Sequence, residues 1–429
     1  MTIPNLPLEL VEVILEHLFG EYDLCAPPVA LYKCSLVSQS WRHIAQSIML
    51  SEITLPAFDA NNHHVDFDTF KKDPVLLQCV RHLFIMEHNW PEIANILPTF
   101  PNLRRIAIIE EILTHTPFQA PVHTFTQVAD RLTSIYLGYL YCFPAQIFNH
   151  CSSLRELRTL NMNFLFSDLK GSDSDASLNK ARLRPRLHLL EIAVGNEDET
   201  EILSWFLRPE CAFDLSELKT LHILDRTCEA PVHRMAQILV EFVAPTIHDL
   251  ALTSPTLDET IDHYITPESL SYMKNLLSIR SVRLPVIQYG DDIAKTNPIP
   301  WVVAFLSNLP RPEYLERVDI PSTTALETSD EDIQNLDKKV ESYGLQMLDS
   351  LLSSSKFPTL KRVNFGSAAF AADDIDGPAR SPILERLYEA RLPHLSERDM
   401  LHFVYCKVTD YLTEAECWWA LKSMLEFEP

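Results

Sequence analysis

A short apolar pattern close to Leu-x-x-Leu-x-Leu returns ten times along this chain of 429 residues. Alternation of apolar and polar side chains, clear at Leu221-His222-Ile223 and Val318-Asp319-Ile320, is typical of a half-buried strand. Successive instances lie 22 to 45 residues apart, from the Ile135–Leu157 step to the Val318–Val363 step. The middle apolar residues of the ten segments are Leu83, Ile106, Ile135, Leu157, Leu190, Leu221, Leu250, Val282, Val318 and Val363.

The residues between these segments supply helices, which we expect at 230–243, 301–309 and 330–352. Strand, helix and strand at this spacing predict right-handed units, and ten in series favour a solenoid with its strands on the concave side. The pattern resembles the leucine-rich repeat family, although most units lack its characteristic Asn and exceed its usual period of about 20–29 residues. An unrelated α/β sheet would show the same alternation. A propeller is disfavoured, because each unit has one strand pattern and the chain has only 8 glycines.

The C-terminal segment predicts two further helices, at about 397–408 and 414–425, each opened by a pattern similar to a capping box. Trp418 and Trp419 would then cover the open end of the last repeat, as solenoids require. The two opening patterns are Ser396-x-x-Asp399 and Thr413-x-x-Glu416.

The first fifty residues predict a small helical bundle. Leu10, Ile14 and Leu18 recur every four residues, as on one face of a helix. A second helical segment follows at 30–37, and Ser38 or Ser40 is expected to cap a third, which begins at about Trp41. About fifty residues make a marginal domain, so some apolar side chains should stay exposed until a partner covers them.

Three pieces of this segment resemble the F-box family. Leu6-Pro7-Leu8-Glu9-Leu10 is similar to its Leu-Pro-x-Glu-Leu opening, and Ile14-Leu15-x-x-Leu18 to its Ile-Leu-x-x-Leu. Cys34–Arg42, with its Leu-Val-Ser-x-x-Trp-Arg sequence, is similar to the late F-box segment. The match covers about a tenth of the chain. It departs from the family in the long stretch 19–28 and in Ser51, which follows Leu50 where the family often has Trp.

The resemblance implies a substrate-recognition subunit of a Skp-cullin-F-box ubiquitin ligase complex. A Skp-type adaptor would bind the F-box and link it to a cullin scaffold, while the solenoid holds an unknown protein substrate. The chain itself would not be an enzyme and would need no cofactor. The residues expected to bind the adaptor are Leu6, Pro7, Leu10, Ile14, Leu15, Leu18, Leu36, Val37 and Trp41.

The sequence therefore predicts an α/β protein with an N-terminal three-helix F-box and an irregular leucine-rich-repeat-like solenoid. The expected boundaries are 1–50 for the F-box, 51–75 for a linker and first strand, 76–395 for the solenoid and 396–429 for a helical cap. Two rival readings stay open: an interaction solenoid that is not coupled to ubiquitination, and a hydrolase with an unrecognised site.

The composition of the chain limits the classes of binding partner and the cellular compartments that we expect. A net charge of −23 disfavours nucleic acid and anionic membranes as partners. No apolar run approaches the roughly 20 residues of a membrane span, and no secretory signal opens the chain. The 9 cysteines include no CxxC pair, which argues against a zinc site and is typical of reduced thiols in the cytoplasm or nucleus.

No catalytic pattern stands out. No two glycines lie close enough for a GxGxxG, P-loop or GxSxG motif, and no HExxH occurs. His63-His64 lies in a polar, acidic stretch that is more typical of a solvated loop than of a metal site. His150-Cys151 are adjacent in sequence, which places no base for a nucleophile, so a core cysteine is expected. We therefore predict no catalytic, metal or cofactor-binding residues.

Polar residues of the strand segments are the expected substrate face, because they alternate with core residues. Several are basic within an acidic protein, which predicts an acidic or phosphorylated segment as the bound partner. Solvated strand faces without a ligand are the alternative. The candidate residues are Arg104, Arg155, His222, Arg283 and Arg317.

Overall fold

The structure, a computed structural model, divides into two compact units, Met1–Arg158 with Met162–Pro185, and Thr159–Asn161 with Arg186–Pro429. It describes residues 7, 10, 11, 13–15, 33–55, 74–85, 96–109, 122–160, 162, 164–165, 184–194, 200–225, 230–253, 266, 269–284, 299–322, 344–370 and 382–408. The division falls within one strand, β6 (Glu156–Leu160). Each unit is described by itself.

The first unit is a parallel sheet whose strands follow one another in chain order. Ile53, Leu83, Ile106 and Ile135 pair side by side and form one row across it. The strands are β1 (Glu52–Leu55), β2 (His82–Ile85), β3 (Arg105–Ile109), β4 (Ser134–Gly138) and β6. The helices are α3 (Gln39–Met49), α5 (Pro74–Cys79) and α7 (Val122–Ala129).

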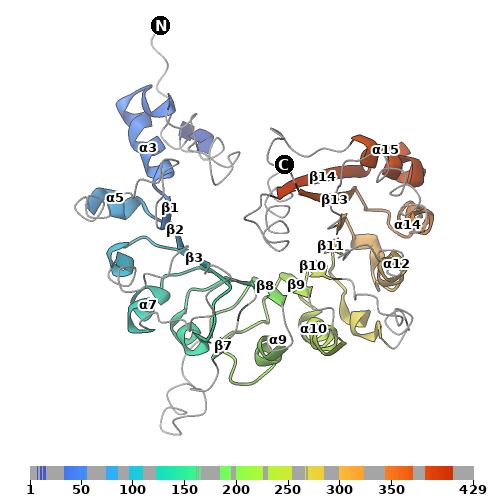
Figure 1. Ribbon diagram of the computed structural model, residues 1–429, viewed down its shortest axis with the longest axis horizontal. Helices are drawn as coiled ribbons and strands as arrows, with labels where there is room; N and C mark the ends of the chain where they lie inside the picture. Colours follow the sequence, from blue (N-terminus) through green and yellow to red (C-terminus); the bar gives the residue numbers. More distant parts are fainter. Residues whose placement is uncertain are drawn as a thin grey trace. The chain divides into compact units, whose positions relative to one another are not determined.

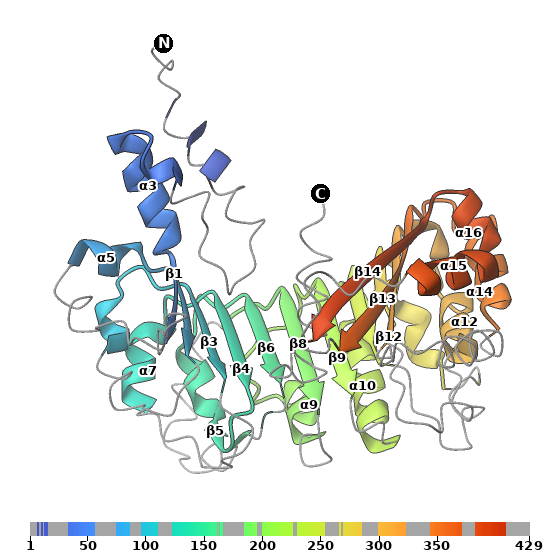
Figure 2. The ribbon, with the colours of Figure 1, turned by 45° about the horizontal axis from the view of Figure 1, so that its top comes forward.

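The second unit repeats this topology. Figure 1 and Figure 2 show its strands side by side with helices along one face. The strands are β8 (Leu189–Val194), β9 (Thr220–Asp225), β10 (Asp249–Leu252), β11 (Ser281–Arg283), β12 (Arg317–Ser322), β13 (Arg362–Phe370) and β14 (Leu401–Val408). The helices are α9 (Thr200–Phe206), α10 (Ala230–Val243), α12 (Ile299–Ser307), α14 (Leu345–Leu352), α15 (Pro382–Arg391) and α16 (Pro393–Glu397).

The middle residues of the apolar segments form the core of the second unit. Six of them pair in register from β8 to β13 and are completely buried beneath the helices. Burial of a Leu or Val side chain stabilises a fold by roughly 1.5–3 kcal/mol, so this row is a main source of stability. The six are Leu190, Leu221, Leu250, Val282, Val318 and Val363.

The ten predicted strand segments are all confirmed as parallel strands, since each coincides with one of β2, β3, β4, β6 and β8–β13. The helix predicted at 230–243 is α10, and the one at 301–309 overlaps α12. Of the helix predicted at 330–352, the structure has α14 over its last turns, and 323–343 lie outside the described residues.

The helix predicted at 397–408 is wrong, because β14 occupies this segment and pairs with β13. Its sequence is rich in β-branched and aromatic side chains, with Phe403, Val404 and Tyr405 in succession, which favours a strand beside an available edge. Ser396 lies near the end of α16, and Asp399 has a left-handed backbone with φ of 55° that ends the helix. The second predicted helix, at 414–425, lies outside the described residues.

A buried carboxylate joins two helices of the second unit. Asp349 in α14 accepts hydrogen bonds from the backbone N–H groups of His394 and Leu395, at 3.2 and 3.0 Å, at the start of α16. Its Oδ2 also lies 2.6 Å from Nδ1 of His394. The first N–H groups of a helix have no partner within it, so Asp349 caps α16 from another element.

Candidate functional site

The N-terminal helical segment has a small core of its own. Val11, Leu15, Ala45 and Ile48 are buried together, and Cys34, Trp41, Ile44 and Met49 pack partly against them. As predicted, Ser38 caps the helix that carries Trp41, α3, with its hydroxyl accepting from the Trp41 N–H at 3.2 Å.

Five large apolar side chains remain exposed around this core, and we call them the N-terminal apolar surface. They are between 41% and 62% exposed, which is high for side chains of this size. In the first helical segment, residues 10, 13 and 14 fall on one side, while 11 and 15 face the core, as helical spacing requires. The five are Leu10, Val13, Ile14, Leu36 and Val37.

Some of the residues predicted to bind an adaptor are exposed in the structure, and one is buried. Leu10, Ile14, Leu36 and Val37 belong to the N-terminal apolar surface, and Pro7 is exposed as well. Leu15, by contrast, is completely buried and packs in the internal core.

Three further residues were predicted to bind the adaptor. Leu6 and Leu18 lie outside the described residues. Trp41 is half-buried against the core, so it supports the bundle with part of its ring.

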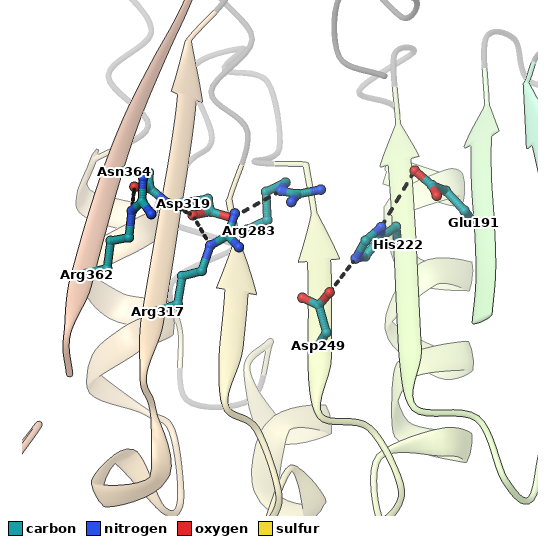
Figure 3. Close-up of polar contacts among 8 residues, drawn as sticks. All are labelled: Glu191, His222, Asp249, Arg283, Arg317, Asp319, Arg362 and Asn364. Carbon is teal, nitrogen blue, oxygen red and sulfur yellow. Dashed lines mark hydrogen bonds and ion pairs between the residues drawn. The ribbon is translucent and has the colours of Figure 1, made fainter. Parts of the chain in front are cut away.

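On the second unit, a row of polar side chains crosses the sheet on the face away from the helices (Figure 3). We call it the polar ladder. Most of its members immediately precede or follow a residue of the buried apolar row, so they point to the opposite face. Its members are Glu191, His222, Asp249, Arg283, Arg317, Asp319, Arg362 and Asn364.

One half of the polar ladder is a histidine between two carboxylates. His222 in β9 is almost completely buried, with Nε2 3.2 Å from Oδ2 of Asp249 and Nδ1 3.6 Å from Oε1 of Glu191. These carboxylates come from β10 and β8, the strands on either side. The contact with Asp249 is within hydrogen-bonding distance, whereas the contact of Nδ1 with Glu191 is longer and is not a hydrogen bond.

The other half is organised around one buried carboxylate, Asp319 in β12. Asp319 accepts hydrogen bonds from Nε of Arg283 at 3.3 Å, Nε of Arg317 at 2.8 Å and Nδ2 of Asn364 at 2.6 Å. Nε of Arg362 in turn donates to Oδ1 of Asn364 at 2.6 Å. Three strands are therefore linked through a single side chain.

The structure brings together three of the five residues predicted for a substrate face. His222, Arg283 and Arg317 share one face of the sheet, but His222 and Arg283 are buried and are not solvated strand residues. Their neighbours on adjacent strands hold them in the contacts just described. Arg104 and Arg155 do not alternate within strands, because β3 begins at Arg105 and β6 at Glu156.

Sequence reasoning missed five of the eight members of the polar ladder. Glu191, Asp319 and Asn364 follow the middle apolar residue of their segments directly, as His222 and Arg283 do. Alignment of the ten segments on that residue places these polar side chains in one column, a signal that was present in the sequence.

A second row lies one step before the strands of the second unit, and we call it the strand-start row. In most of its steps the backbone carbonyl of one member accepts two successive N–H groups of the next, as Lys219 does from His248 and Asp249 at 2.8 and 3.1 Å. Its side chains are exposed or half-buried. The members are His188, Lys219, His248, Arg280, Glu316 and Lys361.

The strand-start row has a positive potential that is visible in two titrating groups. Partial burial lowers the pKa of His248 from its usual value, and the charges of Lys219 and Arg280 lower it further. A hydrogen bond from Lys361 lowers the pKa of Glu316, burial opposes this effect, and the charges of Lys361 and Arg280 lower the pKa further. Both shifts therefore include a contribution from the cations of this row.

We expect His248 to titrate below the pKa of a free histidine, and the Lys219→Ala, Arg280→Ala variant to move its pKa part of the way back. Desolvation is the first cause of the shift and stays in the variant, so the return should be incomplete. A pH titration of the imidazole proton by NMR measures both values. An unchanged pKa in the variant would contradict the repulsion from the two cations.

The described part of the chain shows neither a reactive cysteine nor a metal site. Burial and then the charge of Asp130 raise the pKa of the Cys151 thiol to about 12, which makes it a poor nucleophile. Across the described ranges, no three His, Cys, Asp or Glu side chains gather in a way that could hold a metal ion. His63-His64 lies outside them.

Two findings complete the description. Among the helices that the structure describes, none is both long and apolar enough to cross a membrane. No protein-family model and no curated protein sequence matches this chain.

Proposed function

We propose that this protein is the substrate-recognition subunit of a Skp-cullin-F-box ubiquitin ligase complex. The observation that carries the proposal is the N-terminal apolar surface. Leu10, Ile14, Leu36 and Val37 stand at positions of the F-box-like motifs and are exposed around a small core. A surface of this kind is typical of a helical module that is completed by a partner.

Burial of the N-terminal apolar surface against an adaptor would offset part of the free-energy cost of association. Complete burial of a large apolar side chain against a partner contributes roughly 1.5–3 kcal/mol. The five side chains are already about half-buried, so their complete burial would contribute roughly 4–8 kcal/mol together. This meets only the lower part of the roughly 4–15 kcal/mol lost when two proteins associate, so further contacts would have to supply the rest of the adaptor affinity.

The repeated units would serve as the substrate-binding part. A leucine-rich-repeat-like solenoid requires a stack of units whose main-sheet strands lie side by side in chain order, and the main sheet has that order in both units. In this proposal the chain works in the cytoplasm or nucleus, has no catalytic site and needs no cofactor. It accelerates ubiquitin transfer by holding a protein substrate near a separate enzyme.

Replacing Leu36 and Val37 with Glu should lower capture of a co-expressed Skp-type adaptor by the full chain at least tenfold. Two buried, unpaired carboxylates at an apolar interface are strongly unfavourable. Both side chains are more than half exposed in the chain itself, so the fold should persist. Affinity capture followed by quantitative immunoblotting measures the loss.

A matched control replaces two equally exposed apolar side chains of the second unit, Phe242 in α10 and Met347 in α14, with Glu. This variant should capture the adaptor normally. Failure of the unmutated chain to capture any adaptor would contradict the ligase proposal and favour an interaction module that is not coupled to ubiquitination.

A further inference from the structure

The cations of the strand-start row occupy every second strand. Lys219 precedes β9, Arg280 precedes β11 and Lys361 precedes β13. The positions between them hold His248 and Glu316. Permanent positive charges therefore recur along this edge with a period of two strands.

Strand geometry fixes the spacing of these charges. Neighbouring strands lie about 4.8 Å apart, so cations two strands apart are separated by about 9.6 Å along the edge. The long side chains of Lys and Arg adjust to a ligand by a few ångströms, but their backbone anchors do not move. The row is thus a regular array of single charges, and its geometry does not suggest a pocket for one anion.

Two of the three cations, Lys219 and Arg280, are not neutralised by an acidic side chain in the described part of the chain, and both are exposed. Lys361 pairs with Glu316 at 2.6 Å, but the Lys361 side chain is 73% exposed, and a surface pair of this kind contributes little. All three cations can be reached by a partner from solvent.

We infer that the strand-start row binds an extended acidic segment of a partner polypeptide, in which Asp or Glu recurs at every third residue. A polyproline II segment has three residues per turn and rises about 3.1 Å per residue, so side chains three positions apart lie on one side about 9.3 Å apart. This repeat matches the separation of the cations. Carboxylates on that side would meet Lys219, Arg280 and Lys361 in turn.

If the chain is a substrate receptor, as proposed above, the acidic segment would belong to its substrate, and this part of the inference rests on the proposed function. Peptide binding itself needs no adaptor. It can therefore succeed where adaptor capture fails, and the two failures are distinguishable.

The test measures fluorescence anisotropy of labelled peptides with the full chain. One peptide carries three Glu residues at every third position among Pro and Ala, the second carries three consecutive Glu residues in the same background, and the third has Gln in place of each Glu. The first should bind the unmutated chain most tightly and the third not at all. Its affinity should fall as salt rises, as for any contact between exposed charges.

The Lys219→Glu, Arg280→Glu variant should bind the spaced peptide at least tenfold more weakly, because two attractions become repulsions. The control variant Lys274→Glu, Arg386→Glu has the same net charge and changes two exposed cations outside the row. It should bind within about twofold of the unmutated chain.

Three outcomes would overturn the inference. They are no binding of the spaced peptide to the unmutated chain at low salt, equal weakening by the two charge-reversal variants, and equal or tighter binding of the peptide with consecutive Glu residues. The absence of binding would show that the row is not a peptide site. Equal weakening by both variants would show that only the net charge of the chain matters. Equal or tighter binding of the consecutive-Glu peptide would show that the spacing of the carboxylates has no role.

Discussion

Replacing Asp319 with Ala is expected to destabilise the second unit by roughly 3–5 kcal/mol, the range seen when one partner of a buried ion pair is removed. Asp319 is 1% exposed and accepts hydrogen bonds from Arg283, Arg317 and Asn364 on three strands. Its loss leaves two guanidinium groups beside a cavity that carries no negative charge. Urea unfolding followed by tryptophan fluorescence measures the change, since Trp205 and Trp301 are buried in the same unit.

Glu316→Ala is the matched control, because it removes a carboxylate from the same segment at a half-exposed position. We expect a change within about 0.5 kcal/mol for this variant. Adding Arg283→Met to the Asp319→Ala chain should recover part of the stability, because it removes one of the uncompensated charges. A midpoint for Asp319→Ala equal to that of the control would show that the carboxylate does not organise this part of the sheet.

The second large effect is expected at Asp349, whose replacement by Ala should cost roughly 2–4 kcal/mol. The carboxylate accepts from two N–H groups at the start of α16, and a third contact joins it to the His394 ring. Hydrogen exchange should rise first in α16 and β14, because α16 leads directly into that strand. Asp349→Asn keeps an acceptor for the backbone and should lose less.

Glu397→Ala provides the control for Asp349, because it changes an exposed residue of α16 itself. Its exchange pattern should match that of the unmutated chain. If Asp349→Ala and Glu397→Ala gave the same exchange in α16, the capping interaction would have no role in holding that helix.

The strands could be predicted from the sequence because their signal is carried by the core itself. The residue that an alternating pattern marks as the middle of each segment, such as Leu221 or Val318, must face the helices for the strand to bury any apolar surface. The same argument predicted α10 with its observed bounds, since its apolar residues recur at helical spacing.

Burial of the polar face could not be predicted in this way. A polar residue that alternates with core residues has the same pattern whether it faces water or other protein groups. Asp319 and Glu316 are both acidic and close in sequence, yet one is buried and the other is half-exposed. Only the contacts across neighbouring strands distinguish them.

The C-terminal strand was missed for a related reason. Ser396-x-x-Asp399 is a local pattern, and a local pattern cannot register that the edge of β13 is available to residues 401–408. Pairing along this edge satisfies the backbone of the whole segment and outweighs a helix preference. At the N-terminus, local patterns predicted α3 with a cap at Ser38 or Ser40, and Ser38 is the cap, because a cap depends only on neighbouring residues.

The constant register of the sheet has a consequence for how such a chain can change over time. The connections between successive core residues vary from 22 to 45 residues, yet Val318 and Val363 pair as Leu190 and Leu221 do. Doubling the length of a flexible connection costs only about 0.6 kcal/mol in closure entropy. Insertions between strands are therefore nearly neutral for stability, so descendants of one ancestral chain can come to differ greatly in length and sequence while their strands remain aligned.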